Sequence, residues 1–193
     1  MQLFDYFLKA GLAVALPVLT GTFSPIDQEY LVDTSWQGIF SQPPDVTVQW
    51  VKELRRTLDY IETRPDIDHD RIAYFGNGIG AVDFPVILAL EPRIRVSLTE
   101  SGALDVWKDP PPPEVDPFHF LPRVRTPIMI VNSRYDFGFP YAASQLPTLE
   151  YAGTPAEHKR LVSTETSFPV PNWAVMREAI PWFEKYLGSV EGF

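Results

Sequence analysis

The stretch that decides the fold is Tyr74-Phe75-Gly76-Asn77-Gly78-Ile79-Gly80-Ala81. An apolar run enters a glycine-rich turn there, and a helical pattern follows it. Continuous apolar runs of this kind are typical of parallel strands that are covered on both faces. We therefore predict an α/β fold with a mainly parallel sheet of about five strands and flanking helices. The predicted strands are Leu12–Val18, Arg71–Gly76, Ile94–Thr99, Pro127–Asn132 and Arg160–Thr164.

Helical periodicity fills the intervals between these runs. The clearest helix is Val46–Thr63, where apolar residues recur at steps of three or four and form one stripe. We expect Asp45 to cap its start and Pro65 to end it. Three further helices are predicted to run from Gly80 to about Leu90, over Tyr141–Tyr151, and over Trp173–Leu187 with Asn172 as cap and a bend at Pro181.

Length and composition limit the function classes. A chain of 193 residues fits one domain over residues 1–193, and the absence of cysteine excludes disulfides and thiolate chemistry. A formal charge of −9 disfavours nucleic acid as a partner. The apolar start, Met1–Leu19, contains Asp5, Lys9, Gly11 and Pro17, so we expect neither a signal peptide nor a membrane span. These features predict a cytoplasmic protein.

Two stretches lack a lasting period. Gly21–Pro44 is rich in turn residues, and Lys108–Pro122 contains four consecutive prolines at Pro110–Pro113. The second stretch is too short to link two domains. We predict a lid-like loop over residues 108–122, at the carboxyl edge of the sheet where such folds bind ligands.

Two chemistries use a strand, a glycine-rich turn and a helix. In the nucleophile elbow G-x-S-x-G, the turn presents a serine above the sheet; Gly76, Gly80 and Ala81 fit its flanks, but position 78 is glycine. The dinucleotide turn G-x-G-x-x-G/A is matched by Gly76–Ala81, with Glu100 available for a ribose. A plain tight turn without chemistry is the third interpretation.

Nearly the whole chain resembles the α/β-hydrolase superfamily, in its dienelactone-hydrolase and acyl-peptidase-like branch, and above all the hydrolase domains fused to some bacterial serine/threonine kinases. The similar stretches occur in the family's order. They are residues 12–22 (LAVALPVLTGT), 58–80 (LDYIETRPDIDHDRIAYFGNGIG), 114–124 (EVDPFHFLPRV), 127–140 (PIMIVNSRYDFGFP), 153–160 (GTPAEHKR) and 182–190. The resemblance implies a hydrolase fold of esterase type, and the expected fold class is a truncated α/β-hydrolase fold.

The resemblance also implies where the catalytic residues belong. The family nucleophile falls on Gly78, the family acid on Asp136, and the family histidine on Phe168. One oxyanion donor is the backbone N–H of Ile79. The other donor comes from an HG-containing loop in the family, and we expect this chain to begin after that loop, without the family's first strands.

Without a hydroxyl and a base, the triad mechanism is unavailable to this sequence. We therefore expect a weak or inactive pseudo-hydrolase that binds a ligand or a partner. The alternative is an active hydrolase of small esters or lactones that uses an unassigned nucleophile, or residues shared across an oligomer. The candidate hydroxyls are Ser101 and Ser167, and the candidate bases are His119 and His158.

Aromatic residues cluster in the sequence near the predicted carboxyl edge. They form either packing beneath the loop or an apolar pocket for a small acyl or ester-like ligand. The pocket residues would be Trp107, Phe118, His119, Phe120 and Phe137.

No metal or cofactor is expected. Asp66, Asp68 and Asp70 alternate as in a calcium loop, but the loop's sixth and twelfth positions would be Arg71 and Asn77.

The missing first strands have one more consequence, because in the family a strand separates Leu12–Val18 from Arg71–Gly76. The exposed edge predicts a homo-oligomer or completion by a neighbouring chain.

Overall fold

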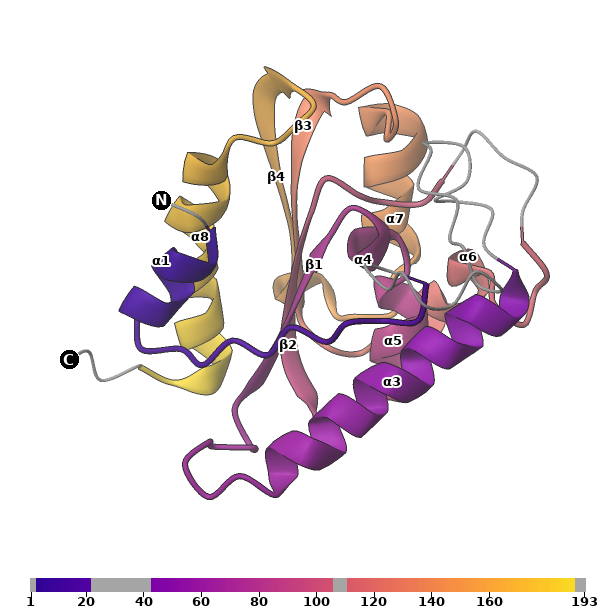
Figure 1. The fold of residues 1–193 in the computed structure, drawn as a ribbon. Coiled ribbons are helices and arrows are strands. Elements are labelled where there is room, and N and C mark those ends of the chain that lie inside the picture. Colours follow the sequence, from indigo (N-terminus) through magenta and orange to yellow (C-terminus); the bar gives the residue numbers. More distant parts are fainter. Residues whose placement is uncertain (1–2, 22–42, 106–110, 190–193) are drawn as a thin grey trace.

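A computed structural model describes residues 3–21, 43–105 and 111–189 of the chain. Its centre is one parallel sheet in which the strands follow the chain order, so β1 and β4 form the two edges (Figure 1). The described residues form four strands, whereas the sequence predicted about five. The strands are β1 (Ile72–Asn77), β2 (Ile94–Glu100), β3 (Ile128–Tyr135) and β4 (Lys159–Ser167).

Helices cover both faces of this sheet (Figure 1). They are α1 (Leu3–Lys9), α3 (Pro44–Glu62), α4 (Ile79–Val82), α5 (Phe84–Leu90), α6 (Pro117–Phe120), α7 (Leu146–Tyr151) and α8 (Asn172–Leu187). Shorter helical turns lie at Leu121–Arg123, Tyr141–Gln145 and Ala156–His158. Among the helices of the described ranges, none is long and apolar enough to cross a membrane.

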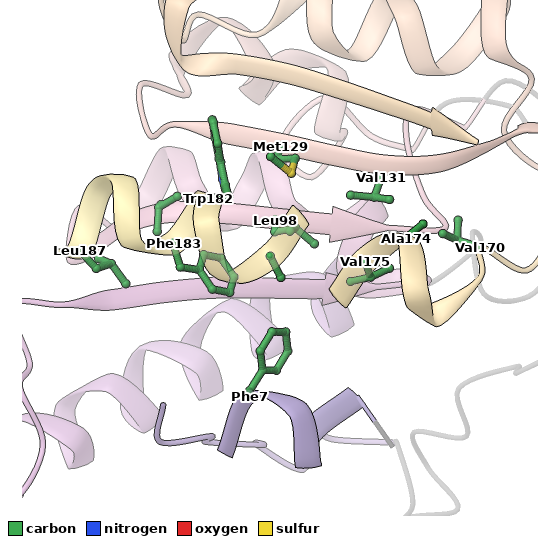
Figure 2. Close-up of a cluster of buried hydrophobic side chains, with 12 residues drawn as sticks. Phe7, Leu98, Met129, Val131, Val170, Ala174, Val175, Trp182, Phe183 and Leu187 are labelled. Carbon is green, nitrogen blue, oxygen red and sulfur yellow. The ribbon is translucent and has the colours of Figure 1, made fainter. Parts of the chain in front are cut away.

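The two faces carry separate hydrophobic clusters. On one face α1 and α8 pack against the sheet (Figure 2), and the Phe7 ring contacts those of Phe75 and Phe183. On the other face α3, α5 and α7 cover a second cluster around Phe84 and Ile128. Right-handed crossovers between successive parallel strands place their helices on one face, which leaves the other face to α1 and α8 near the two ends of the chain.

The predicted strand Leu12–Val18 is wrong. Residues 12–19 form no strand; they cross from α1 to α3 (Figure 1), and their end is held by Trp50, whose indole N–H donates to the Thr20 carbonyl at 2.8 Å. An apolar run becomes a strand only where a neighbour accepts its hydrogen bonds. Among the described residues, no strand pairs with this segment.

Several helix boundaries also differ from the prediction. Asp45 lies inside α3 and makes no capping bond, since the helix begins at Pro44. The helix after Gly80 breaks at Asp83 into α4 and α5, and Asn172 is the first residue of α8 rather than its cap.

The proline-rich loop is partly helical. Asp116 accepts a hydrogen bond from the Phe118 N–H and so starts the one-turn helix α6, with Pro117 in the first position. Only residues 111–122 of this stretch are described, and most of Gly21–Pro44 lies outside the described residues.

Candidate ligand site at the carboxyl edge of the sheet

The glycine-rich turn places residue 78 in a conformation that L residues rarely adopt. Gly78 has φ 55° and ψ −114° and joins the end of β1 directly to α4. A methyl group at this position would meet nothing within 4 Å. The turn therefore leaves open space for a side chain at position 78, and glycine puts none there.

Gly76 and Gly102 lack side chains for a different reason, namely close packing of the backbone. A methyl group at Gly76 would lie 2.6 Å from the Gly80 carbonyl oxygen, and one at Gly102 would lie 2.4 Å from the Ala81 Cβ. Strand, helix and the next loop approach too closely for side chains there. This is the steric pattern of a nucleophile elbow, in which small flanking residues allow the close approach and the central residue projects outward.

Hydrogen bonds align the neighbouring strand ends at the same edge. The Gly78 N–H donates to the Glu100 carbonyl at 3.3 Å, and the Asn77 Nδ2 donates to Glu100 Oε1 at 3.0 Å. Burial raises the pKa of the Glu100 carboxyl. Because Glu100 is buried and held by Asn77, it is not free to bind a ribose, and α4 spans only four residues. These observations do not favour the dinucleotide interpretation.

Ser101 follows Glu100 and is a buried residue with a positive φ of 53°. Its neighbour Gly102 exchanges two hydrogen bonds with the side chain of Asn132, at 3.3 and 3.1 Å. These bonds to Gly102, together with the bond from the Gly78 N–H to the Glu100 carbonyl, hold Ser101 in a backbone conformation that costs free energy in an L residue. Nothing in the sequence predicts that Ser101 has a positive φ.

Asp136 lies just beyond β3 and is only 3% exposed. Its Oδ1 accepts hydrogen bonds from the backbone N–H groups of Gly138 at 2.8 Å and Phe139 at 3.2 Å. Its Oδ2 is buried and has no hydrogen-bond partner among the residues that the structure describes. The Asp136 carboxylate is thus fixed at one oxygen and unsatisfied at the other.

Phe168, the residue that the resemblance predicts in place of the family histidine, is next to this loop. Its ring meets the Phe137 ring edge to face, with centroids 5.9 Å apart. The loop also contacts α4, because Phe139, Val82 and Ala103 form one buried cluster. The structure therefore brings residue 168 beside the Asp136 loop and packs that loop against the helix that follows Gly78.

Ile79 begins α4, the short helix after the turn. The N–H groups of Ala81 and Val82 donate to the Gly78 carbonyl, at 2.9 and 3.1 Å. Within the part of the chain that the structure describes, no backbone carbonyl accepts from the Ile79 N–H. The sequence analysis assigned this N–H group as an oxyanion donor.

The predicted aromatic pocket is not one cluster. Phe118 packs against His119 and against Tyr151 of α7, at 5.7 and 5.3 Å between ring centroids, and Phe120 joins the cluster beneath α5. Phe137 instead contacts Phe168. Trp107 lies outside the described residues.

The two candidate bases lie in different places. His158 precedes β4, at the amino end of the parallel sheet, and its Nδ1 lies 3.0 Å from the Tyr186 hydroxyl. Asp136 follows β3 at the opposite end, so His158 is far from the site along the strands. His119 is exposed on α6, with Nε2 3.7 Å from Asp116 Oδ2. Ser167 ends β4, and its carbonyl accepts from the Ser133 hydroxyl at 2.9 Å.

The alternating aspartates are held by neighbouring residues in the turn between α3 and β1. Asp66 pairs with Arg64 at 2.6 Å, and Asp68 accepts from the Asp70 N–H at 3.1 Å. In residues 3–21, 43–105 and 111–189, no group of three or more histidine, aspartate or glutamate side chains is arranged to hold a metal ion.

The sequence analysis missed Asp83, which separates α4 from α5. Burial raises the pKa of this carboxyl to about 7, and its charge raises the pKa of the neighbouring Tyr74 hydroxyl further. An aspartate directly before the apolar run of α5 is the only sequence signal for it.

Comparison with solved structures agrees with this architecture. A cold-adapted esterase from an Arctic intertidal metagenomic library, in its zinc-bound structure, matches with a TM-score of 0.63 and 16% identity over 82% of this chain and 66% of its own. TT1662 from Thermus thermophilus matches with a TM-score of 0.63 and 19% identity over 77% of this chain and 66% of its own. An acylaminoacyl peptidase from Pyrococcus horikoshii matches with a TM-score of 0.58 and 16% identity over 76% of this chain and 29% of its own.

These matches define the fold. The chain has the α/β-hydrolase fold, in a form with four parallel strands, and it spans about two thirds of the esterase and TT1662 chains. Comparison with protein-family models found no match, and comparison with curated protein sequences found none either.

Proposed function

We propose that this chain is a pseudo-hydrolase that binds a small acyl or ester-like ligand at the carboxyl edge of its sheet. The proposal rests on two features taken together: the turn at Gly78 has no side chain, and one oxygen of the Asp136 carboxylate has no hydrogen-bond donor among the described residues. Gly78 has the backbone geometry and the open space of a nucleophile position but no hydroxyl, and Asp136 keeps a buried oxygen without the donor that a histidine would supply. Phe168 has no proton to exchange.

Reconstruction of the triad tests this proposal. Gly78→Ser combined with Phe168→His restores a hydroxyl and an imidazole, and we expect hydrolysis of p-nitrophenyl butyrate to rise at least about tenfold above wild type. Gly78→Ala with Phe168→His is the matched control, because it has the same backbone strain without a hydroxyl. Adding Asp136→Asn should remove the gain. Substantial turnover by the wild-type protein, or equal rates for both double variants, would overturn the proposal.

The competing function is an active ester or lactone hydrolase. One observation favours it: Ser101 is a buried serine with positive φ, and the carbonyl of its neighbour Glu100 accepts a hydrogen bond from the Gly78 N–H. Wild-type turnover of p-nitrophenyl butyrate that is lost in Ser101→Ala would support this function. Turnover that survives the substitution would exclude Ser101 as the nucleophile.

Self-association remains part of the proposal. Strand β1 forms an edge of the sheet, and the crossing segment beside it exposes Val14, Leu16 and Val18. Open edges and apolar surface favour pairing with a second copy. Light scattering after size-exclusion chromatography is expected to give a dimer or larger, and Leu16→Glu should shift it toward monomer. A monomer at micromolar concentration would contradict self-association.

A further inference from the structure

The outer edge of β4 has no hydrogen-bonding neighbour in the described part of the chain. Strand β4 (Lys159–Ser167) ends the sheet and pairs with β3 along its inner side (Figure 1). No backbone N–H or C=O group of residues 159–167 bonds to a described element other than β3. An edge strand of this kind presents a row of unpaired donors and acceptors, which is a template for a further strand.

This edge is long and regular enough to pair. Short strands and prolines make an edge unsuitable for pairing, but β4 has nine residues and no proline. Its register with β3 is regular from Lys159 to Thr164, and the irregularity lies beyond Thr164. Solvent reaches the strand, since Leu161 and Val162 are only half-buried, whereas β3 is buried over most of its length. Leucine, valine and threonine side chains fit an extended backbone.

The side chains of β4 alternate between the two faces of the sheet. The Lys159 Nζ donates to the Ala152 carbonyl just beyond α7 at 2.6 Å, and Arg160 pairs with Glu178 of α8 at 2.8 Å. Odd-numbered residues therefore lie on the α7 face and even-numbered residues on the α8 face, as the alternation of a strand requires. The bond to Ala152 fixes the positive charge of Lys159 close to the start of the strand.

Glu165 has a negative charge on the same face as Lys159. The Thr164 and Thr166 hydroxyls lie 2.6 Å apart and so share the α8 face, which leaves Glu165 on the α7 face. Its side chain is 69% exposed and contacts exposed side chains at the end of β3, and such contacts contribute little free energy. The strand thus has opposite charges near its two ends on one face.

A second copy of β4 complements both charges at once. Two copies related by a twofold axis perpendicular to the sheet pair antiparallel, and residues that lie directly opposite share a face. With the axis at Val162, Lys159 of each copy lies opposite Glu165 of the other copy. An axis at Arg160 would instead place this arginine opposite itself, and like charges directly opposite are destabilising. The charges therefore favour the register with the axis at Val162.

We propose that β4 pairs antiparallel with β4 of a second copy, about a twofold axis at Val162, so that two four-stranded sheets become one continuous sheet. This contact goes beyond the self-association proposed above, because it uses the edge opposite to β1 and the crossing segment. Each chain then has two separate contacts, and copies joined through both form assemblies larger than a dimer. Ester turnover plays no part in these contacts, so the pseudo-hydrolase is tested separately.

Charge reversal at Glu165 tests the register. The background is Leu16→Glu, which weakens the contact at the crossing segment, and the readout is light scattering after size-exclusion chromatography at micromolar concentration. We expect Leu16→Glu to remain a dimer. Adding Glu165→Lys should raise the dissociation constant at least about tenfold, because Lys159 then lies opposite a lysine.

The outcomes separate the two contacts. A monomeric Leu16→Glu variant beside an associating wild type would overturn the β4 contact and leave the contact at the crossing segment standing. A monomeric wild type would overturn both. Glu114→Lys is the matched control, since it makes the same change of charge at an exposed residue before α6 and should leave the dissociation constant unchanged. Equal losses in Glu165→Lys and Glu114→Lys would overturn the proposed register.

Hydrogen exchange locates the contact in the Leu16→Glu dimer. Amide N–H groups along the outer edge of β4 exchange readily in a monomer, and their exchange should slow at least about tenfold at concentrations where the dimer forms. Peptides that cover β1 (Ile72–Asn77) should exchange at the same rate in monomer and dimer. A dimer in which β4 gains no protection would place the contact elsewhere and overturn the proposal.

Discussion

The Tyr74 hydroxyl donates a hydrogen bond to the Gly80 carbonyl oxygen at 2.7 Å. This bond joins β1 to α4 across the turn at Gly78. Burial raises the pKa of the hydroxyl, so it stays a proton donor over the whole accessible pH range. The shape of the turn thus depends on a side chain that lies beneath it.

Removing this hydroxyl is expected to destabilise the protein. Tyr74→Phe leaves the Gly80 carbonyl without its donor and should lower the free energy of unfolding by about 1–2 kcal/mol in urea titrations. Tyr135→Phe is the matched control, since its bond to Glu165 is exposed and should contribute little. Equal effects would mean that the bond in the turn does not matter.

Alanine at the two glycines of the elbow should have different costs. Gly78→Ala meets no atom but places an L residue at positive φ, which should cost about 1–2 kcal/mol. Gly76→Ala forces its methyl group to 2.6 Å from the Gly80 oxygen and should cost more. Thermal and urea unfolding of both variants measure this order, and the reverse order would show that the turn differs from the one described.

Glycine at position 101 should stabilise the fold. Ser101 has φ 53°, a conformation that costs a serine about 1 kcal/mol and a glycine almost nothing, so Ser101→Gly should raise the melting temperature. Ser97→Gly in the interior of β2 should do the opposite, because glycine weakens a strand. A loss of stability in Ser101→Gly would show that the serine side chain itself holds the loop.

Asp83 predicts a fall of stability with rising pH. Its pKa is about 7 in the folded chain, against about 4 when unfolded, so between these values the unfolded state has lost a proton that the folded state keeps. The free energy of unfolding should therefore fall from pH 4 to 7 and level off above. The side chain keeps some exposure, and we expect about 1–2 kcal/mol rather than the full shift. The fall should be smaller in Asp83→Asn, and an unchanged pH profile would contradict this assignment.

The sequence predicts the strands well because a strand buried on both faces needs a continuous apolar run. The same rule fails for Leu12–Val18, since apolar character says nothing of a hydrogen-bonding neighbour. Glycine marks the elbow for two separable reasons, close approach at Gly76 and positive φ at Gly78, and the sequence shows only that glycine is present.

The site is less predictable than the fold. Asp136 was singled out through the family resemblance, but its unsatisfied oxygen depends on what surrounds it in three dimensions. The aromatic residues near the edge divide between two neighbourhoods because α6 packs toward α7, while Phe137 turns to Phe168. The spacing of the aromatic residues in the sequence predicts neither of these two contacts.

The crossing segment between α1 and α3 has a practical consequence. Proteases bind their substrates as extended chains, and this segment is irregular with Leu16 69% exposed. A nick there would not release α1, because Phe7 stays inserted between Phe75 and Phe183. Residues 3–16 are thus expected to stay bound to the rest of the protein as a separate peptide after such a nick, which makes the chain a candidate for a split-protein reporter.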